Sequence, residues 1–154
     1  MKIIIFGLGN FGMSLAVNLT ETGNEDIGID NNMGKVDLVK DKISHAVCMD
    51  ATSELAYRAL PIKDADLAVI AIGENEGAAI IATAIVKKLT KARIIGRSLS
   101  PIHDTVLNAM GIKTIIHPEQ DFAERLAKKI NLKGIVDNFN IDKNYSISEI
   151  KALP

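Results

Sequence analysis

Short apolar runs alternate with helical patterns along most of the chain. Runs rich in Ile, Val and Ala predict six strands, at residues 2–6, 26–30, 44–49, 65–72, 92–97 and 113–117. Apolar positions three or four residues apart predict helices at 11–22, 33–42, 53–60, 75–89, 101–110 and 119–131. Glycines at positions 23 and 111 follow two of these helices and are expected to end them.

The predicted strands are apolar without interruption, which is typical of strands covered on both faces. Such strands occur in parallel sheets, and strands that alternate with helices build right-handed βαβ units. The pattern therefore predicts an α/β fold, a Rossmann-like doubly wound parallel sheet of about six strands with helices on both faces. In the helix at 33–42, we expect Val36, Leu38 and Val39 to face inward.

Composition narrows the possible functions. The 154 residues suffice for one domain, and the formal charge is 18 − 19 = −1 without a basic block, which argues against nucleic-acid binding. The single cysteine, Cys48, excludes an intrachain disulfide and is expected to be a small buried apolar residue. The chain shows neither a cleavable signal pattern nor an apolar stretch of about 18 residues, so we expect a soluble, cytoplasmic protein.

A glycine-rich loop follows the first predicted strand and opens the first helix. It reads Gly7-Leu8-Gly9-Asn10-Phe11-Gly12. In such a loop the first glycine permits a tight turn and the second allows a phosphate to approach the backbone, while the third lets the helix pack closely on the sheet. The free N–H groups of the helix N-terminus then favour an anion. An ordinary strand–helix turn is the alternative interpretation of these glycines.

Asp30 ends the second predicted strand, 18 residues after Gly12, close to the spacing of about 20 expected for an acid that binds a ribose. An aspartate at this position accepts hydrogen bonds from ribose hydroxyls and repels a 2′-phosphate, which favours NAD or another adenosine nucleotide over NADP. A solvated strand end would also explain Asp30, but the two features in register favour nucleotide binding.

Ligands of open α/β sheets bind beyond the carboxyl ends of the strands, so the residues at those ends are further candidates. Asp50 and Thr52 suit an adenine or ribose edge, and helix capping explains them nearly as well. Gly73 suits close approach of a ligand or a plain turn. Arg97 suits a phosphate or a solvated surface position, and Glu119 suits a metal ion or the first turn of a helix.

Catalytic patterns are not found in the sequence. The three histidines fall in separate segments, and none belongs to a recognisable nucleophile motif or a zinc-protease motif. We therefore expect a binding protein, not an enzyme. A small NAD-dependent oxidoreductase domain without its substrate domain is the alternative, and a plain NAD-sensing or structural subunit is a third hypothesis.

Six segments in order resemble the KTN, or RCK, family of cytoplasmic regulators of Trk and Ktr potassium uptake systems and of some potassium channels. The segments are IIIFGLGNFGMSLAVNL at 3–19, IGID at 27–30, MDATSE at 49–54, ADLAVIAIGENEGAAI at 65–80, ARIIGRS at 92–98 and GIKTIIHPEQDFAERLAKKI at 111–130. YSISEIKALP at 145–154 is similar to the start of the family's second domain. We therefore expect a nucleotide-binding domain at 1–134, and at 135–154 a linker with the start of a further, missing C-terminal domain.

The resemblance implies a membrane potassium transporter subunit as partner, a homodimer or larger ring, and a peripheral location at the inner membrane. It implies NAD/NADH first and ATP/ADP second as ligands, with Glu119 near a divalent Mg or Ca ion. Asn10 departs from the arginine that related members often carry there, which favours NAD/NADH. Together, motif and resemblance give these nucleotide-binding candidates: Gly7, Leu8, Gly9, Asn10, Phe11, Gly12, Asp30, Asn31, Asp50, Ala51, Thr52, Ala71, Ile72, Gly73, Glu74 and Arg97.

The helix expected at 75–89 is apolar around most of its circumference. One side carries Ala78, Ile81, Ala82, Ile85 and Leu89, and the other carries Ala79, Ile80 and Val86. A helix on a sheet needs one apolar stripe, so the second requires cover from neighbouring helices or from another subunit. We expect a subunit contact, joined by Val106 and Met110 of the helix at 101–110.

Overall fold

The structure, a computed structural model, describes residues 1–132, 135–140 and 146–150 and divides into two compact units. The first unit is Met1–His117, and the second is Pro118–Pro154. Residues 133–134, 141–145 and 151–154 lie outside the described residues, and so does part of the predicted linker at 135–154. The two units are described separately below.

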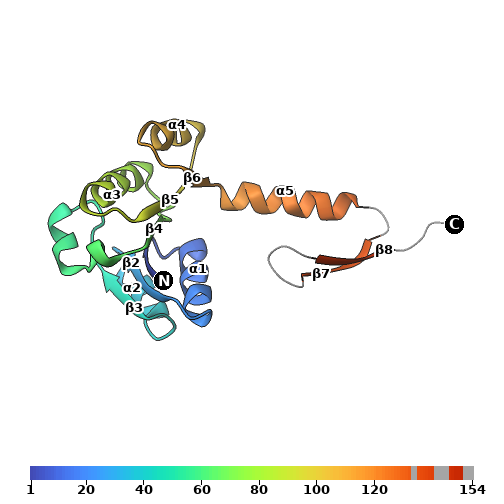
Figure 1. The fold of residues 1–154 in the computed structure, drawn as a ribbon, viewed down its shortest axis with the longest axis horizontal. Coiled ribbons are helices and arrows are strands. Elements are labelled where there is room, and N and C mark those ends of the chain that lie inside the picture. Colours follow the sequence, from blue (N-terminus) through green and yellow to red (C-terminus); the bar gives the residue numbers. More distant parts are fainter. Residues whose placement is uncertain (133–134, 141–145, 151–154) are drawn as a thin grey trace. The chain divides into compact units, whose positions relative to one another are not determined.

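The first unit alternates strands and helices in the predicted order (Figure 1). Its strands are β1 (Lys2–Phe6), β2 (Glu25–Asp30), β3 (His45–Cys48), β4 (Leu67–Ile70), β5 (Arg93–Arg97) and β6 (Thr114–Ile116). Its α-helices are α1 (Asn10–Glu21), α2 (Met33–Val39), α3 (Glu76–Leu89) and α4 (Pro101–Ala109). The helix predicted at 53–60 is instead the 3-10 helix η1 (Glu54–Ala59), which η2 (Ile62–Asp64) follows.

The six strands form one parallel sheet in the order β3-β2-β1-β4-β5-β6. β1 pairs in parallel register with β2 on one side and β4 on the other, so that Ile4 lies opposite Ile27 and Ala68. The remaining neighbours within this sheet are also parallel. The order confirms the predicted doubly wound, Rossmann-like sheet, in which the chain reverses its direction of winding between β1 and β4.

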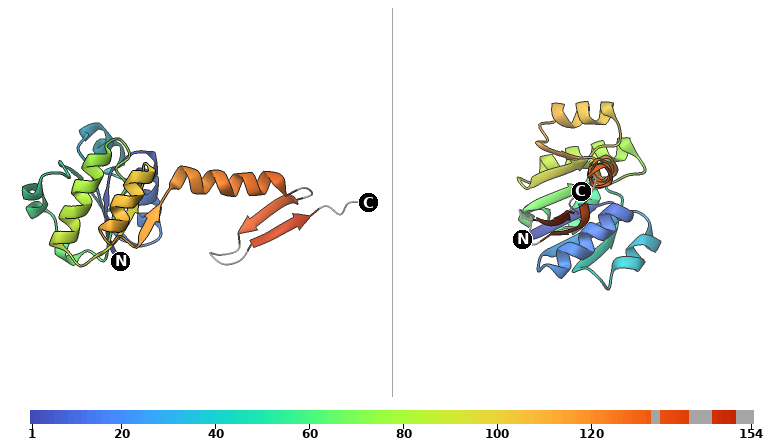
Figure 2. Two further views of the ribbon diagram at one scale, coloured as in Figure 1. Left: turned by 90° about the horizontal axis from the view of Figure 1, so that it is seen from above. Right: turned by 90° about the vertical axis from the view of Figure 1, so that its right-hand side faces the viewer.

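Helices cover the two faces of this sheet, as Figure 2 shows. Ile3 and Ile5 of β1 pack on one face against Ala16 of α1 and Val36 of α2. The alternate residues of β1 belong to a second core on the other face, because successive side chains of a strand point to opposite faces. This second core includes Ile4, Phe6, Ile29, Tyr57, Ala68, Ile70, Ala79, Ala82 and Val86. Burial on both faces explains why the strands are continuously apolar.

Two inward predictions are wrong. Leu38 is 66% exposed, whereas Val36 and Val39 are buried. Successive residues of an α-helix turn by about 100°, so Val36 and Val39 share a face that Leu38 does not reach. Cys48 is exposed rather than buried, because it is the last residue of β3, a strand at the edge of the sheet.

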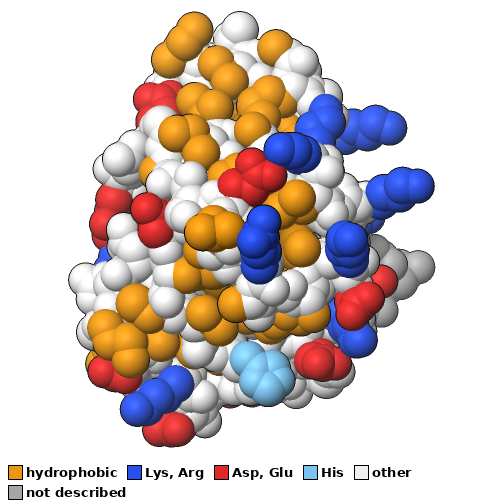
Figure 3. Space-filling view, turned by 90° about the vertical axis from the view of Figure 1, so that its left-hand side faces the viewer, with side chains coloured by type: hydrophobic (Ala, Val, Ile, Leu, Met, Phe, Trp, Pro, Cys, Tyr) orange, Lys and Arg blue, Asp and Glu red, His pale blue; other side chains and the backbone are white. Residues whose placement is uncertain are grey.

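The apolar helix α3 is only partly available for a subunit contact. Ile85, which we placed on the same side of the helix as Ile81, is 8% exposed and belongs to the core, whereas Ile81 is 47% exposed. Most of the apolar circumference of α3 is therefore covered by its own sheet and neighbours. Figure 3 shows apolar side chains reaching the surface among charged ones on the face at the left of Figure 1.

The second unit contains α5 (Pro118–Asn131) and the strands β7 (Ile135–Asn140) and β8 (Ser146–Ile150). Within the stretch that we predicted to be a linker, β7 and β8 form an antiparallel pair in which Phe139 lies opposite Ile147.

Candidate nucleotide-binding site

The reversal between β1 and β4 places two loops side by side at the carboxyl edge of the sheet. The loop after β1 begins at Gly7 and continues into α1, while the loop after β4 contains Gly73 and Glu74 and continues into α3. α1 and α3 contribute to the cores on opposite faces of the sheet, so the two loops diverge from neighbouring strands. Such a switch point is where ligands of doubly wound sheets bind.

Two glycines of the first loop are required by its geometry. Gly7 has φ +98°, and a Cβ on it would lie 2.8 Å from the carbonyl carbon of Ala71 and from the backbone nitrogen of Ile72. A Cβ on Gly12 would lie 1.8 Å from the carbonyl oxygen of Gly7, which no side chain tolerates. The start of α1 is therefore packed directly on the loop, and the loop on the end of β4.

Gly9 differs from its two neighbours, because an added Cβ would meet no atom within 4 Å. Packing within the chain therefore does not require a glycine at this position. A glycine facing open space at the N-cap of α1 leaves the backbone accessible, which suits the close approach of a phosphate. The open space beside Gly9 leaves room for a phosphate at the N-terminus of α1, so the loop fits a nucleotide.

Asp30 is tied to this loop by hydrogen bonds. Its Oδ2 accepts from the backbone N–H of Leu8 at 2.8 Å, and its Oδ1 accepts from the backbone N–H of Asn32 at 2.8 Å. The side chain of Leu8 is fully buried in the core between the sheet and α1, so the loop is held on both sides. A carboxylate has about four acceptor positions, and Asp30 therefore retains capacity for sugar hydroxyls.

The turn after β3 is organised by its own side chains. Asp50 Oδ1 accepts from the backbone N–H of Thr52 at 2.9 Å and from its hydroxyl at 2.7 Å. These bonds hold the pKa of the Asp50 carboxyl below its usual value. The carbonyl oxygen of Ala51 accepts from the Tyr57 hydroxyl at 2.7 Å. The contacts agree with the turn interpretation of Asp50 and Thr52, and both side chains stand at the carboxyl edge next to β2.

Arg97 connects the end of β5 with both loops of the switch point. Its guanidinium carbon lies 5.8 Å from the centroid of the Phe11 ring in α1, an arrangement typical of a cation–π contact. A Cβ on Gly73 would lie 2.9 Å from the Nη1 atom of Arg97. The arginine therefore lies over the glycine that follows β4, and a permanent positive charge is placed at the switch point.

The sequence analysis did not find the ion pair between Lys35 and Glu74. Lys35, in α2, donates from Nζ to Oε1 of Glu74, which follows β4. This hydrogen bond raises the pKa of Lys35 above its ordinary value, against desolvation, and the charge of Asp30 raises it further. A lysine on a short helix carries no pattern that marks it as a site residue, so only the folded chain shows it.

The predicted residues thus fall into three groups. The loop at 7–12, Asp30, Ala71, Ile72, Gly73, Glu74 and Arg97 lie together around the switch point through the contacts described above. Asn31 and the turn at 50–52 stand beside it, at the ends of β2 and β3, where the Sγ of Cys48 lies 3.6 Å from the Asn31 carbonyl oxygen. Glu119 belongs to α5 in the other unit, and its assignment as a metal ligand stays a prediction.

Two further observations concern the residues that the structure describes. Among them, no group of three or more His, Cys, Asp or Glu side chains is arranged to hold a metal ion. Within the same residues, no helix combines the length and the apolar character needed to cross a bilayer.

Comparison with known families decides the relationship of the chain. Residues 3–118 match the family described as the TrkA-N domain. The chain belongs to this family. It is 35% identical over 151 residues to the Ktr system potassium uptake protein C of Bacillus subtilis, and 31% identical over 151 residues to protein A of the same system and organism. Each alignment covers 98% of this chain and 68% of the relative.

Solved structures agree on the TrkA-N fold. The TrkA-N domain of the inner membrane protein ybaL from Escherichia coli is 18% identical, with a TM-score of 0.75 over 84% of this chain and 96% of that chain. The GsuK channel bound to NAD is 14% identical, with a TM-score of 0.68 over 94% of this chain and 26% of that chain. At these identities the likeness shows the fold alone.

Proposed function

We propose that this TrkA-N chain is the nucleotide-sensing part of a regulatory subunit that gates potassium uptake through a membrane transporter of the Trk or Ktr type. Its ligand is an adenosine nucleotide, NAD or NADH in the first place and ATP or ADP in the second. The proposal rests on the relatives, which are named potassium uptake proteins, and on the architecture of the switch point.

The observation that carries the proposal is the contrast among the three loop glycines. Gly7 and Gly12 are required by contacts within the chain, whereas Gly9 faces open space beside a helix N-terminus. The N–H groups of Gly7 and Leu8 are bonded to Ile29 and Asp30, so in this proposal the phosphates bind the N–H groups at the start of α1, beside Gly9. The NAD of the GsuK channel structure supports a dinucleotide as a ligand of this fold.

In this proposal, the residues around the loop each contact a different part of the nucleotide. Asp30 accepts from the ribose hydroxyls while it continues to hold the Leu8 amide. Arg97 places its positive charge beside the phosphates and remains stacked on Phe11, so binding is coupled to the position of α1. The turn at 50–52 faces the adenine. None of these roles needs a bond to be made or broken, so we propose binding rather than catalysis.

A bound nucleotide regulates only through a difference in its affinity for two arrangements of the protein. We propose that the chain works as a homodimer or larger ring, peripheral to the inner membrane on its cytoplasmic side, and that the two states of the nucleotide differ in charge at Arg97. Residues 1–134 form the nucleotide-binding domain in this scheme. Glu119 holds a divalent Mg or Ca ion near the phosphates when the subunits assemble.

Calorimetric titration tests the proposal with NADH, NAD, ATP and ADP, each with and without Mg²⁺, on the parent chain and on Asp30→Ala. We expect saturable binding that is strongest for the NAD/NADH pair and weaker by about tenfold in the variant, because one charge-assisted hydrogen bond contributes about 1.5–3 kcal/mol. Equal weak binding of all four nucleotides, unchanged in Asp30→Ala, contradicts the assignment of the site.

A further inference from the structure

One ion pair joins the two halves of the sheet across the switch point. Lys35 belongs to α2, which follows β2, and Glu74 belongs to the loop that follows β4. In the sheet, β1 lies between β2 and β4. The hydrogen bond from Lys35 Nζ to Glu74 Oε1 therefore spans the strand whose carboxyl end opens into the glycine loop.

Lys35 stands close to the proposed ribose-binding acid as well. Its side chain is only 25% exposed, although lysine side chains at a protein surface usually extend into water, whereas that of Glu74 is 76% exposed. The Asp30 carboxylate is near enough to act on Lys35 electrostatically. Two carboxylates therefore act on the ammonium group, Glu74 through a hydrogen bond and Asp30 through its charge.

The chemistry of this arrangement concerns a phosphate on the ribose. In dinucleotide-binding folds, a cation near the end of the second strand receives a 2′-phosphate, and an acid at that end receives a free 2′-hydroxyl. This chain has both, an acid in Asp30 and a cation in Lys35. Glu74 is paired with Lys35, so the net charge of Asp30, Lys35 and Glu74 together is −1. This net charge repels a 2′-phosphate and tolerates the neutral ribose diol.

We propose that Glu74 determines the specificity of the site by sequestering Lys35, so that the crevice accepts nucleotides with a free ribose 2′-hydroxyl and rejects those with a 2′-phosphate. The inference rests on the proposed function and names its substrate class more closely. Asp30 alone does not explain the rejection of a 2′-phosphate, because Lys35 without Glu74 would be available to bind that phosphate.

The test uses the smallest pair of ligands that differ only in this phosphate, adenosine 5′-monophosphate and adenosine 2′,5′-bisphosphate. Their dissociation constants are measured by calorimetry at low ionic strength, where exposed charges are least screened. Glu74→Gln frees Lys35, and we expect the affinity for the bisphosphate relative to the monophosphate to increase by up to about fivefold, the scale of one exposed charge pair. Lys35→Met removes the cation, and we expect the same ratio to decrease by a similar factor.

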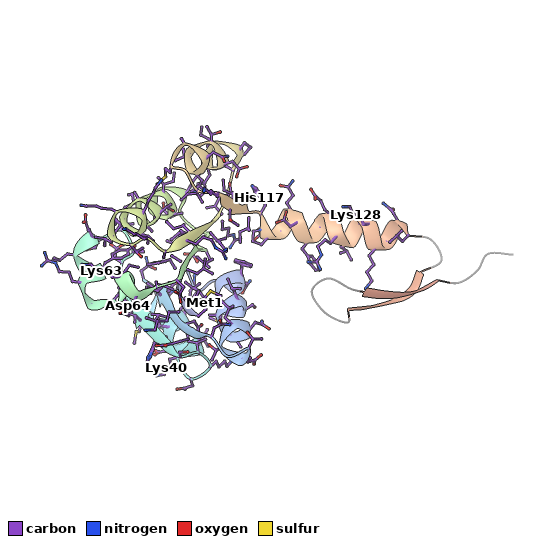
Figure 4. The ribbon with its side chains drawn as sticks, viewed as in Figure 1. Met1, Lys40, Lys63, Asp64, His117 and Lys128 are labelled. Atoms are coloured by element: carbon purple, nitrogen blue, oxygen red, sulfur yellow. The ribbon has the colours of Figure 1, made fainter. Side chains whose placement is uncertain are left out.

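An ion pair with a structural role alone gives a different result. Loss of either partner would then weaken the binding of both ligands, and the ratio of their affinities would not shift in opposite directions in the two variants. Opposite shifts in the ratio are the signature of the proposal, and the double variant, which restores one negative charge, is expected to return towards the parent. Matched controls are Asp37→Asn and Lys40→Met, which break the exposed Lys40–Asp37 pair of the same helix at 3.4 Å. Lys40, labelled in Figure 4, follows the last residue of α2, at the end opposite the crevice.

Two results overturn the inference while leaving the proposed function intact. One is a parent chain that binds the monophosphate but shows the same ligand ratio in both variants and in the controls. The other is a ratio that moves in the same direction in Glu74→Gln and Lys35→Met. A parent chain that binds neither these ligands nor NADH and ATP overturns the proposed function, and the inference falls with it.

Discussion

The two halves of the sheet prepare the same edge by different means. In the half β1–β3, the candidate site consists mainly of backbone: Gly7 and Gly12 are fixed by contacts of main-chain atoms, and the Leu8 amide donates to the Asp30 carboxylate. In the half β4–β6, the site consists of charged side chains, Glu74 and Arg97, which reach across to α2 and α1. The first half offers main-chain groups, and the second offers charged side chains.

This difference shows which parts of the site should be rigid and which should be selective. A main-chain cradle binds any phosphate of suitable shape, because backbone N–H groups are the same in every sequence. Charged side chains distinguish ligands by their charge. We therefore expect changes in the main-chain loop to affect all nucleotides together, and changes in the charged side chains at the switch point to alter discrimination with little effect on folding.

The largest effect is expected from Gly12→Ala. Its new Cβ would lie 1.8 Å from the Gly7 carbonyl oxygen, so α1 must move away from the loop. Overpacking of this kind costs about 1–3 kcal/mol in the free energy of unfolding, and this contact is more severe than most. Urea denaturation of the parent and the variant measures the loss.

Gly9→Ala is the matched control for this change, because its Cβ meets no atom within 4 Å. We expect the free energy of unfolding to stay within about 0.5 kcal/mol of the parent, as at ordinary surface positions. Nucleotide binding should nevertheless weaken, because the methyl group fills the space beside Gly9 in which we propose that the phosphate binds. Equal destabilisation by both substitutions would contradict the distinction between the two glycines.

A smaller loss of stability is expected from Asp30→Asn. The amide keeps one acceptor oxygen, so either Leu8 or Asn32 loses its hydrogen-bond partner, at about 1–2 kcal/mol in the free energy of unfolding. Thermal unfolding of this variant and of Asp41→Asn, an exposed control, measures the difference. A free energy equal to that of the control would show that Asp30 does not hold the loop.

The second half also provides the surface at which we expect subunits to meet. Ile81 of α3 is 47% exposed, and Ile81→Glu should leave folding unchanged but weaken self-association. Light scattering over a range of concentrations compares its mass with that of the parent and of Leu55→Glu, which changes another exposed apolar residue, 66% exposed, in η1. A monomeric parent, or a dimer unaffected at Ile81, rules out α3 as the contact.

The smallest effect concerns pH. Hydrogen bonds from Ser98 and His117 hold the pKa of Asp104 below its model-compound value of 3.8. A carboxyl with a lowered pKa stabilises the fold above pH 3.8, and this contribution is lost as the pH falls through the folded value. We expect Asp104→Asn to be less stable than the parent at pH 6, and the difference to vanish in acid. Denaturation curves across this range check it, and a difference that persists at low pH would contradict the cause.

The sequence alone predicts the parallel sheet of the first unit and the position of the glycine loop within it. Continuous apolar strands, helical spacing and the loop at 7–12 are local patterns, and each follows from a period or from glycine geometry. The position of Asp30 in the candidate site was also predictable, because one helix and one strand separate it from Gly12 and bring it to the end of the second strand. The hydrogen bond from the Leu8 amide to Asp30 was not predictable, because it depends on the pairing of β1 with β2.

The remaining features depend on which side chains meet across elements. Lys35 and Glu74 lie 39 residues apart in the chain, and of the two only Glu74 belongs to a segment that resembles the family. Ile85 and Ile81 share a helix and an apolar character, and only the packing of α3 on its sheet buries one and exposes the other. Such choices are made by tertiary contacts and leave no period in the sequence.

The central claim is that an adenosine nucleotide binds to the backbone amides of the loop after β1. The most direct measurement follows the glycine amide signals in a nitrogen–proton correlation spectrum during titration with NADH or ADP. We predict saturable shifts for Gly7, Gly9 and Gly12, while Gly23 and Gly111, which follow α1 and α4 outside the loop, keep their positions. Shifts confined to glycines outside the loop, or no shifts at saturating nucleotide, would contradict the account.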